Sequence, residues 1–395
     1  MKTKAFLSGN EAVAEGVRLV SPHVIAAYPI TPQTGVVERL AEMVEDGSIR
    51  AGFLNVESEH SALSAAIGAS AVGARTFTAT SSQGLLYMAE CLHYASGGRF
   101  PIVMMNANRS LALPWSIYGD HRDSLSLLDS GWIQVYVEDA QESLDMVIQC
   151  YAIAENLKVL TPVMLNLDGF TLTHTYELVE LPTKDEVQEF LPAFDTPYKM
   201  DFENPKNMGF SSTPADNMEF KYQQHKAVLD AKKIIREVDA AFKERFGRGY
   251  GGLVDAYKCD DAEMIVVCLG STTGTCRTVV DELREEGWKV GVLKIRFMRP
   301  FPEEDIIHYT RNTKAVAVID RDISFGYEGT VYTNVNSALA KTGRDILKLN
   351  FIAGLGGRNI SKDNIREIFI ELKEGMEGKK KEHVRFLGLG VSVDE

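Results

Sequence analysis

Residues 53–106 read FLNVESEHSALSAAIGASAVGARTFTATSSQGLLYMAECLHYASGGRFPIVMMN, a series of short apolar runs separated by longer helical stretches. The periodicity predicts helices at Ser58–Val72 and Leu85–Ser96, and strands at Phe53–Val56, Arg75–Thr80 and Ile102–Asn106. Strands separated by helices predict a parallel sheet with helices on both faces. This segment therefore indicates an α/β fold with a doubly wound parallel sheet.

The same alternation continues on both sides of this segment. It predicts helices at Glu11–Val20, Gly35–Glu45 and Ala140–Asn156, and strands at His23–Ala27, Trp132–Tyr136 and Pro162–Leu167. The pattern stops near residue 181 and returns near residue 259, with one long charged helix predicted between them at Phe220–Phe246. A chain of 395 residues is too long for one ordinary core. We therefore predict a doubly wound domain at 1–180, a connecting arm with a long helix at 181–258, and a smaller α/β domain at 259–395.

Composition narrows the range of partners. The formal net charge of -13 argues against a nucleic-acid-binding face, which would have to be basic. Neither a signal peptide nor an apolar run of about 20 residues is found, so we expect a cytoplasmic protein with no membrane contact. The five cysteines are scattered without a CxxC pair, and we expect no metal site or disulfide framework in this chain.

Polar side chains follow the predicted strands. Tyr28-Pro29-Ile30-Thr31-Pro32 leaves the first strand, and its prolines hold the backbone extended, which presents Thr31 at the carboxyl end of the sheet. Glu59 opens a helix of small and apolar residues, where a carboxylate is costly unless it is paired or used. Ser82 and Gln83 lie in a strand-to-helix turn whose polar groups could bind a ligand. Arg109 follows a strand, and its forked guanidinium suits a carboxylate.

Each of these residues also has a structural explanation when it is taken alone. Thr31 could cap the next helix, and Glu59 could simply favour a positive helix N-terminus, an effect of about 0.3 to 1 kcal/mol. Arg109 could form an ion pair with a neighbour such as Asp120. His60 and His121 are more often structural than catalytic. The glycine turns at 270–274 and 354–357 match neither dinucleotide-binding nor P-loop patterns, and we interpret them as tight strand-to-helix turns.

In combination, the motifs resemble the α subunit of the 2-oxoacid:ferredoxin oxidoreductases over essentially the whole chain. The matching segments are Gly9-Asn10-Glu11-Ala12, Tyr28-Pro29-Ile30-Thr31-Pro32, Glu57-Ser58-Glu59-His60, Thr80-Ser81-Ser82-Gln83-Gly84, Ala107-Asn108-Arg109, Gly119-Asp120-His121, Gly131-Trp132-Ile133-Gln134 and Asn166-Leu167-Asp168-Gly169-Phe170. The 2-oxoglutarate branch typically carries Gly-Pro-Gly where this chain has Ser82-Gln83-Gly84. In this motif the chain therefore resembles the pyruvate-type branch of the family.

The resemblance implies a pyrimidine-type thiamine diphosphate domain followed by a transketolase-C-like domain. By matching position, Glu59 would hydrogen-bond the pyrimidine ring nitrogen, and Tyr28, Ser82 and Gln83 would complete the cofactor contacts of this chain. Thr31 and Arg109 would bind the substrate carboxylate. Glu59, Arg109 and Thr31 would then be the catalytic residues of an oxidative decarboxylation.

The resemblance also implies partner chains. This sequence has no Gly-Asp-Gly motif with a following Asn to bind Mg²⁺ and diphosphate, and no cysteine set to ligate a cluster. A β subunit would supply the Mg²⁺ and diphosphate site and a 4Fe–4S cluster, γ and/or δ ferredoxin-like subunits would be further partners, and ferredoxin would accept the electrons. We expect a dimer of heteromers in which the arm at 181–258 wraps a neighbouring subunit, because its long polar helix has little core to join.

Residues 109–122 depart from the pyruvate pattern. Trp115 falls where pyruvate enzymes usually carry a smaller aliphatic residue beside the substrate methyl, and Arg122 adds a second cation. A larger side chain at Trp115 and a second positive charge at Arg122 would suit a substrate that is a dianion without a methyl group. In this stretch the chain resembles oxalate oxidoreductase. We therefore expect oxidation of oxalate to CO₂, with Trp115 and Arg122 also lining the substrate site. Coenzyme A-dependent pyruvate oxidation is the alternative; a non-catalytic scaffold subunit and a nicotinamide-dependent dehydrogenase are more distant ones.

Overall fold

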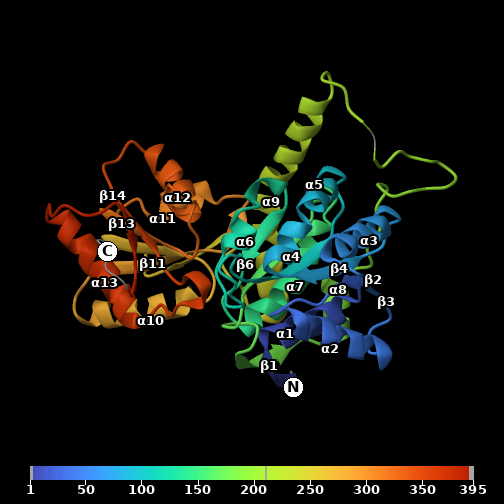
Figure 1. Ribbon diagram of the computed structural model, residues 1–395, viewed down its shortest axis with the longest axis horizontal. Coiled ribbons are helices and arrows are strands. Elements are labelled where there is room, and N and C mark those ends of the chain that lie inside the picture. The colour runs from blue at the N-terminus through green and yellow to red at the C-terminus, as the bar shows by residue number, and fades with distance from the viewer. Residues whose placement is uncertain (1–2, 210, 391–395) are drawn as a thin grey trace.

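The computed structural model describes residues 3–209 and 211–390, which form two α/β lobes side by side (Figure 1). The larger lobe contains a seven-stranded sheet in the order β12-β6-β7-β5-β4-β2-β3. Its strands are β2 (Val24–Ala27), β3 (Gly52–Asn55), β4 (Thr76–Thr80), β5 (Val103–Asn108), β6 (Ile133–Tyr136), β7 (Val163–Asp168) and β12 (Phe297–Arg299). All neighbouring pairs are parallel except β12 with β6. The predicted α/β class with a parallel sheet is confirmed.

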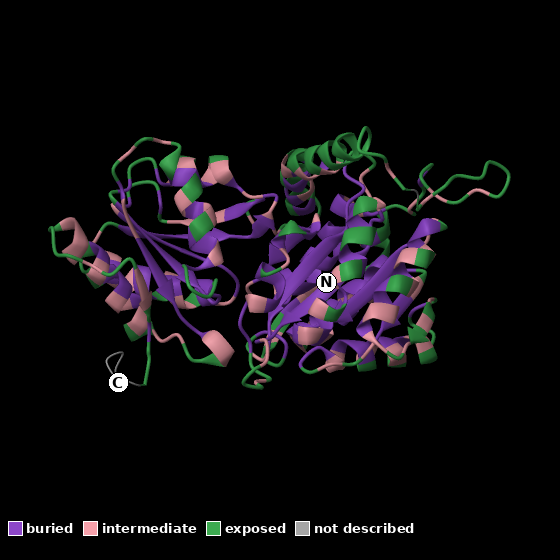
Figure 2. Ribbon diagram, turned by 45° about the horizontal axis from the view of Figure 1, so that its top comes forward, coloured by how far each residue is buried: buried purple, intermediate pink, exposed green. Residues whose placement is uncertain are grey.

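Helices cover both faces of this sheet. One face packs against α1 (Gly9–Val20), α2 (Thr34–Glu45) and α7 (Ala140–Ala154), and the other against α3 (Glu59–Ala71), α4 (Ser82–Tyr87) and α5 (Ala89–Gly97). Side chains alternate between the two faces of a strand, so each strand of this sheet contributes to two hydrophobic cores. In β5, Val103 and Met105 pack into the core beneath α1, α2 and α7, and Met104 packs into the core beneath α3, α4 and α5. Figure 2 shows the buried strands between helices that are exposed only on their outer sides. The helix predicted at Leu85–Ser96 is divided at Met88 into α4 and α5.

The smaller lobe contains a six-stranded sheet in the order β15-β14-β13-β10-β11-β9. Its strands are β9 (Val254–Tyr257), β10 (Met264–Cys268), β11 (Val290–Ile295), β13 (Ala315–Asp320), β14 (Leu347–Ile352) and β15 (Val384–Phe386). One face packs against α10 (Thr272–Glu285) and α13 (Lys362–Met376), and the other against α11 (Glu303–Tyr309) and α12 (Thr330–Ala340). The second face shares its hydrophobic core with the larger lobe, so the two lobes are packed together.

Several short elements were not predicted from the sequence. They are β1 (Thr3–Ser8) and β8 (Tyr176–Leu181), which form a two-stranded antiparallel sheet, the edge strands β9 and β15 of the smaller lobe, and α6 (Arg122–Leu125), η1 (Leu128–Ser130), α8 (Lys184–Phe190) and η2 (Leu355–Gly357). The strand β12 was also missed, although it extends the first sheet from a distant part of the chain. The strands β1 and β8 are mostly exposed or only partly buried, so they lack the continuous apolar run of a buried strand. The short helices and β12 contain too few residues to establish a period.

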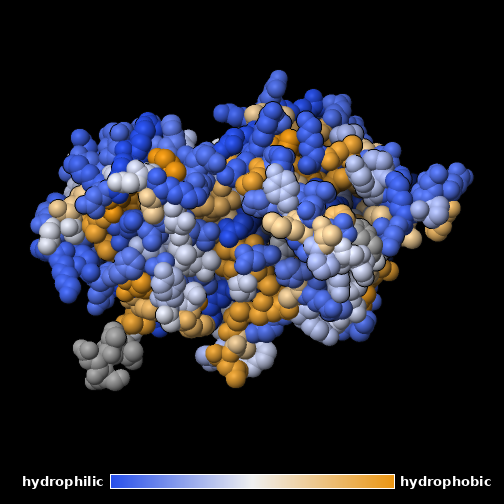
Figure 3. Space-filling view, turned by 90° about the horizontal axis from the view of Figure 1, so that it is seen from above, coloured by the Kyte–Doolittle hydropathy of each residue, from blue (hydrophilic) through white to orange (hydrophobic). Residues whose placement is uncertain are grey.

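The long helix α9 (Asn217–Phe246) corrects one expectation about the arm. Its C-terminal half is not without a core, because Ile235, Phe242 and Phe246 join the core that also contains α7. Its N-terminal half is exposed and projects from the lobe with the preceding arm (Figure 1). Seen from that side, the surface is mostly hydrophilic, with hydrophobic patches between the charged groups (Figure 3). Among the described residues, no helix combines the length and the apolar character that a bilayer span requires.

A buried ion cluster joins the lobes. Glu142 in α7 accepts hydrogen bonds from Lys294 Nζ at 2.6 Å and from Arg296 Nε at 2.8 Å, and all three side chains are buried. Burial alone would raise the pKa of Glu142, but the two cations outweigh it and lower that pKa to about 2. The cluster therefore stabilises the junction through a carboxylate that is fully ionised near neutral pH.

Candidate active site

The turn after β2 is fixed in place by two buried amides. Gln33 donates from Nε2 to the carbonyl of Ala79 in β4 at 2.7 Å, and Asn10 donates from Nδ2 to the carbonyl of Pro32 at 2.9 Å. Thr31 directly precedes the two anchored residues Pro32 and Gln33, and its side chain is exposed after the carboxyl end of β2. Neither Gln33 nor Asn10 was predicted to have a role, because a buried amide gives no sequence signal distinct from an exposed one.

Arg109 meets the Thr31 turn. Its Nη1 donates to the carbonyl of Thr31 at 3.0 Å, and its Nε donates to the carbonyl of Ser116 at 3.0 Å. Asp120, the structural partner considered above, binds Arg122 instead. No carboxylate of the described residues lies within 4 Å of the Arg109 guanidinium, which is largely buried. Burial lowers the pKa of Arg109, yet an arginine stays protonated, so this cation can accept the carboxylate of a ligand.

Glu59 is the first residue of α3, whose N-cap is Ser58. The side chain of Glu59 is only 8% exposed, and among the described residues no hydrogen bond or ion pair holds its carboxylate. Its Oε1 lies 2.6 Å from the point where a Cβ on Gly84 would be, and Thr80 Oγ1 lies 2.8 Å from the same point. The missing side chain at Gly84 therefore makes room for this carboxylate. A buried carboxylate without an internal donor fits a ligand that brings an N–H group.

Of the other residues predicted to contact the cofactor, Ser82 is buried, whereas Gln83 and Tyr28 are partly exposed. Ser82 is buried, with Oγ at 2.7 Å from the carbonyl of Ser110, so it supports the loop after Arg109. Gln83 is partly exposed, and its Oε1 lies 2.6 Å from Ser82 Oγ. Tyr28 is also partly exposed, and its carbonyl accepts from Gln33. Gln83 and Tyr28 thus retain exposed side-chain surface near the strand ends.

Asp123 ties these segments together and was not predicted. Its carboxylate accepts the backbone N–H groups of Ser82 and Arg109, both at 3.1 Å, and the side chain of Asn108 at 2.8 Å. The carboxyl group is fully buried, and burial raises its pKa to about 6 although the hydrogen bonds act in the opposite direction. Asp123 therefore holds the start of α4 and the end of β5 in one arrangement.

Asp168, at the end of β7, links the site to the smaller lobe. It lies 2.6 Å from His121 Nε2 and 2.7 Å from Arg321 Nη1, and it accepts the backbone N–H of Ser271 at 2.8 Å. Burial would raise the pKa of Asp168, but Arg321 and His121 outweigh it and hold that pKa well below its usual range. His121 thus has a structural partner, and the turn at 270–274 anchors one lobe on the other.

The residues expected to select the substrate follow Arg109, with Trp115 in the loop and Arg122 at the start of α6. Trp115 is 71% exposed, and the charge of Arg122 is compensated by Asp120, whose Oδ2 lies 2.8 Å from Nη2. Arg122 is therefore already paired in this chain. The loop also contacts the smaller lobe, since the backbone N–H of Gly356 donates to Asp120 Oδ2 at 3.0 Å.

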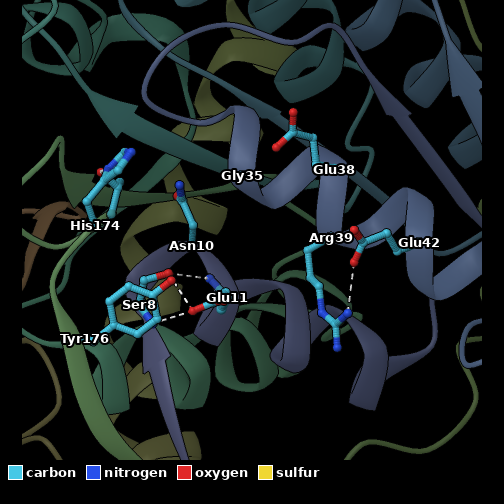
Figure 4. Close-up of a pocket in the computed structure, with 10 residues that line it drawn as sticks. Ser8, Asn10, Glu11, Gly35, Glu38, Arg39, Glu42, His174 and Tyr176 are labelled. Carbon is cyan, nitrogen blue, oxygen red and sulfur yellow. Dashed lines mark hydrogen bonds and ion pairs between the residues drawn. The ribbon is translucent and has the colours of Figure 1, made fainter.

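A surface cleft of about 280 Å³ lies beside α1 and α2, and Figure 4 shows its polar lining. The ion pair between Arg39 and Glu42 and the capping hydrogen bonds between Ser8 and Glu11 occupy much of its wall. The lining residues are Ser8, Asn10, Glu11, Gly35, Glu38, Arg39, Glu42, Thr173, His174 and Tyr176. This lining includes none of the predicted site residues.

Comparison with known proteins defines the class first. Residues 15–240 match the family model described as pyruvate flavodoxin/ferredoxin oxidoreductase, thiamine diphosphate-binding, and residues 262–365 match pyruvate:ferredoxin oxidoreductase core domain II. The protein is therefore a thiamine diphosphate-dependent oxidoreductase. It belongs to the family of 2-oxoacid:ferredoxin oxidoreductase α subunits, as its relatives show.

Two curated relatives cover nearly the whole chain. Pyruvate synthase subunit PorA of Methanothermobacter thermautotrophicus is 49% identical over 362 residues, which are 92% of this chain and 93% of that protein. Ketoisovalerate oxidoreductase subunit VorA of Pyrococcus horikoshii is 45% identical over 379 residues, which are 95% of each chain.

A solved structure supports the fold. The 2-oxoglutarate:ferredoxin oxidoreductase of Magnetococcus marinus superposes with a TM-score of 0.72 at 21% identity, covering 94% of this chain and 65% of that chain. At this identity the likeness concerns the fold alone.

Proposed function

We propose that this chain is the α subunit of a pyruvate:ferredoxin oxidoreductase that produces acetyl-coenzyme A. The high similarity to pyruvate synthase subunits over nearly the whole chain carries the proposal. Oxalate, which the sequence favoured, is not supported: the relatives are named for pyruvate and ketoisovalerate. The physical reason for expecting a dianion is also weakened, because Asp120 already compensates the charge of Arg122.

The residues of this chain fit half of a thiamine diphosphate site. When bound, thiamine diphosphate supplies the carbon nucleophile for the 2-oxo group and accepts the electrons that decarboxylation leaves behind. Glu59 would accept a hydrogen bond from the pyrimidine ring nitrogen and so hold its proton. Arg109 would bind the substrate carboxylate, with Thr31 beside it. Tyr28 and Gln83 would flank the pyrimidine, and Ser82 would orient Gln83 through the hydrogen bond from its Oγ to Gln83 Oε1.

The rest of the site would come from other chains. A β subunit would supply the Mg²⁺ and diphosphate contacts and a 4Fe–4S cluster, and γ and/or δ ferredoxin-like subunits would pass electrons to ferredoxin. The division into 1–180, 181–258 and 259–395 would then separate the pyrimidine domain, an arm against a neighbouring subunit, and a transketolase-C-like domain. The exposed aromatic side chains of the arm, Tyr198 and Phe202 among them, support a contact of this kind.

The substrate is tested with the purified complex and a low-potential electron acceptor. We expect pyruvate to be oxidised with the highest kcat/KM, and only when coenzyme A is present. The competing substrates are 3-methyl-2-oxobutanoate and oxalate. A higher kcat/KM for 3-methyl-2-oxobutanoate would assign the branched-chain substrate, and oxalate oxidation without coenzyme A would restore the dianion interpretation.

Substituting Gly84 by Ala is expected to lower kcat by about 100-fold, because the new Cβ would displace the Glu59 carboxylate. Gly68→Ala, in the same helix as Glu59, is the matched control, since a Cβ at Gly68 meets open space. The measurement is the steady-state rate of pyruvate oxidation by each assembled variant. Equal rates for the two variants would show that the space at Gly84 is not needed.

A further inference from the structure

A second cleft, of about 380 Å³, lies away from the candidate active site. It lies between α5, η1, the exposed half of α9 and the end of β12. The turn of η1 leads into the amino end of β6, whereas Thr31 and Arg109 follow the carboxyl ends of their strands. The lining residues are His93, Leu128, Asp129, Ser130, Gly131, Trp132, Lys221, Gln224, His225, Val228 and Arg299.

The polar lining of this cleft contains two cations and one carboxylate. Arg299 and Lys221 face only one lining carboxylate, that of Asp129, and neither forms an ion pair within 4 Å among the described residues. Arg299 is oriented by the carbonyl of Met298 at 2.7 Å and by Asn334 Oδ1 at 3.1 Å. Burial lowers the pKa of Arg299 by more than the nearby charge of Asp129 raises it, because the guanidinium has lost water and no carboxylate of the described residues lies within 4 Å of it.

A buried hydroxyl in the same lining has no partner. Ser130 is only 2% exposed, and its Oγ makes no hydrogen bond with any described residue. The adjacent Gly131 has a φ of +79°, and a Cβ there would lie 2.2 Å from Gln224 Nε2, so a glycine allows α9 to close over the turn. Leu128 and Trp132 provide an apolar wall beside these polar groups.

We propose that this cleft is a binding site for a small phosphomonoester. A phosphate carries nearly two negative charges and three acceptor oxygens, which match a guanidinium fork, an ammonium group and a hydroxyl donor. The apolar wall would contact the organic part of the ligand. Arg299 holds the anion from the side of β12, Lys221 closes over it from α9, and Ser130 donates from η1.

The test is calorimetric titration of the assembled complex with glycerol 3-phosphate, inorganic phosphate and succinate. We expect saturable binding of glycerol 3-phosphate, weaker binding of inorganic phosphate and none of succinate. Lys221→Gln and Ser130→Ala should each weaken glycerol 3-phosphate binding by about tenfold. Lys226→Gln is the matched control, because Lys226 lies on the same helix, pairs with Asp230 and does not line the cleft.

Three results would overturn the proposal: no saturable binding at millimolar concentration, succinate binding as tight as that of glycerol 3-phosphate, or an equal loss in Lys226→Gln. Because binding is measured directly, the test does not depend on which 2-oxoacid the complex oxidises. Lys221 lies on the exposed part of α9, so Lys221→Gln remains informative even if Ser130→Ala does not fold.

Discussion

Replacing Glu59 by Gln is expected to reduce pyruvate-dependent electron transfer by about 100- to 10,000-fold, the usual contribution of a positioned acid–base group. Glutamine keeps the size of the side chain but removes the charge that would hold a proton on the pyrimidine ring. The rate is measured as reduction of a low-potential acceptor by the assembled complex. We expect the assembly itself to be unchanged, because no other described residue bonds to the Glu59 carboxylate.

Glu57→Gln is the matched control for this variant. Glu57 lies two residues earlier, is exposed, and its Oε1 accepts a hydrogen bond from Ser61 Oγ at 2.5 Å. Its loss should leave the rate within about twofold of the wild type, since exposed hydrogen bonds contribute little. An undiminished rate in Glu59→Gln would instead favour the scaffold alternative, in which the thiamine fold serves assembly alone.

Glu142→Gln is expected to lower the free energy of unfolding by about 3 kcal/mol, because it removes the nearest carboxylate of both Lys294 and Arg296. Each buried cation then keeps one more distant carboxylate, Glu138 at 3.2 Å from Lys294 Nζ and Asp239 at 3.9 Å from Arg296 Nη1. Chemical denaturation at neutral pH measures the change. Glu263→Gln is the control, because Glu263 forms an exposed pair with Lys314 at 2.8 Å, and such pairs contribute about 0 to 1 kcal/mol. Equal losses for the two variants would contradict a special role for the buried cluster.

The Glu142 carboxylate also predicts how the free energy of unfolding changes with pH. The pKa of Glu142 is lowered from 4.5 to about 2 in the folded chain, so the unfolded state binds more protons between these values. Its stabilising contribution is therefore complete above about pH 4.5 and is lost as the pH falls towards about 2. Glu142→Gln should lack this component of acid destabilisation. A parallel acid profile for the wild type and the variant would contradict the assigned pKa.

The sequence predicted the layers of the fold because long helices and buried strands repeat their pattern often enough to be recognised. It also placed Thr31, Glu59 and Arg109 at strand ends that meet at one edge of the sheet. It did not reveal Asp123 or Asp168 as organising residues, because their importance arises from donors contributed by distant segments. The pairing of Arg122 with Asp120 was equally hidden, since a loop of unknown path does not show which cation a carboxylate meets.

The most direct test is the structure of the assembled complex with thiamine diphosphate bound. The Glu59 carboxylate is expected within hydrogen-bond distance, about 2.6 to 3.2 Å, of a pyrimidine ring nitrogen, while another chain holds the diphosphate. A pyrimidine ring held by a different chain, with Glu59 turned away from it, would contradict the assignment of this chain as the pyrimidine-activating half of the site.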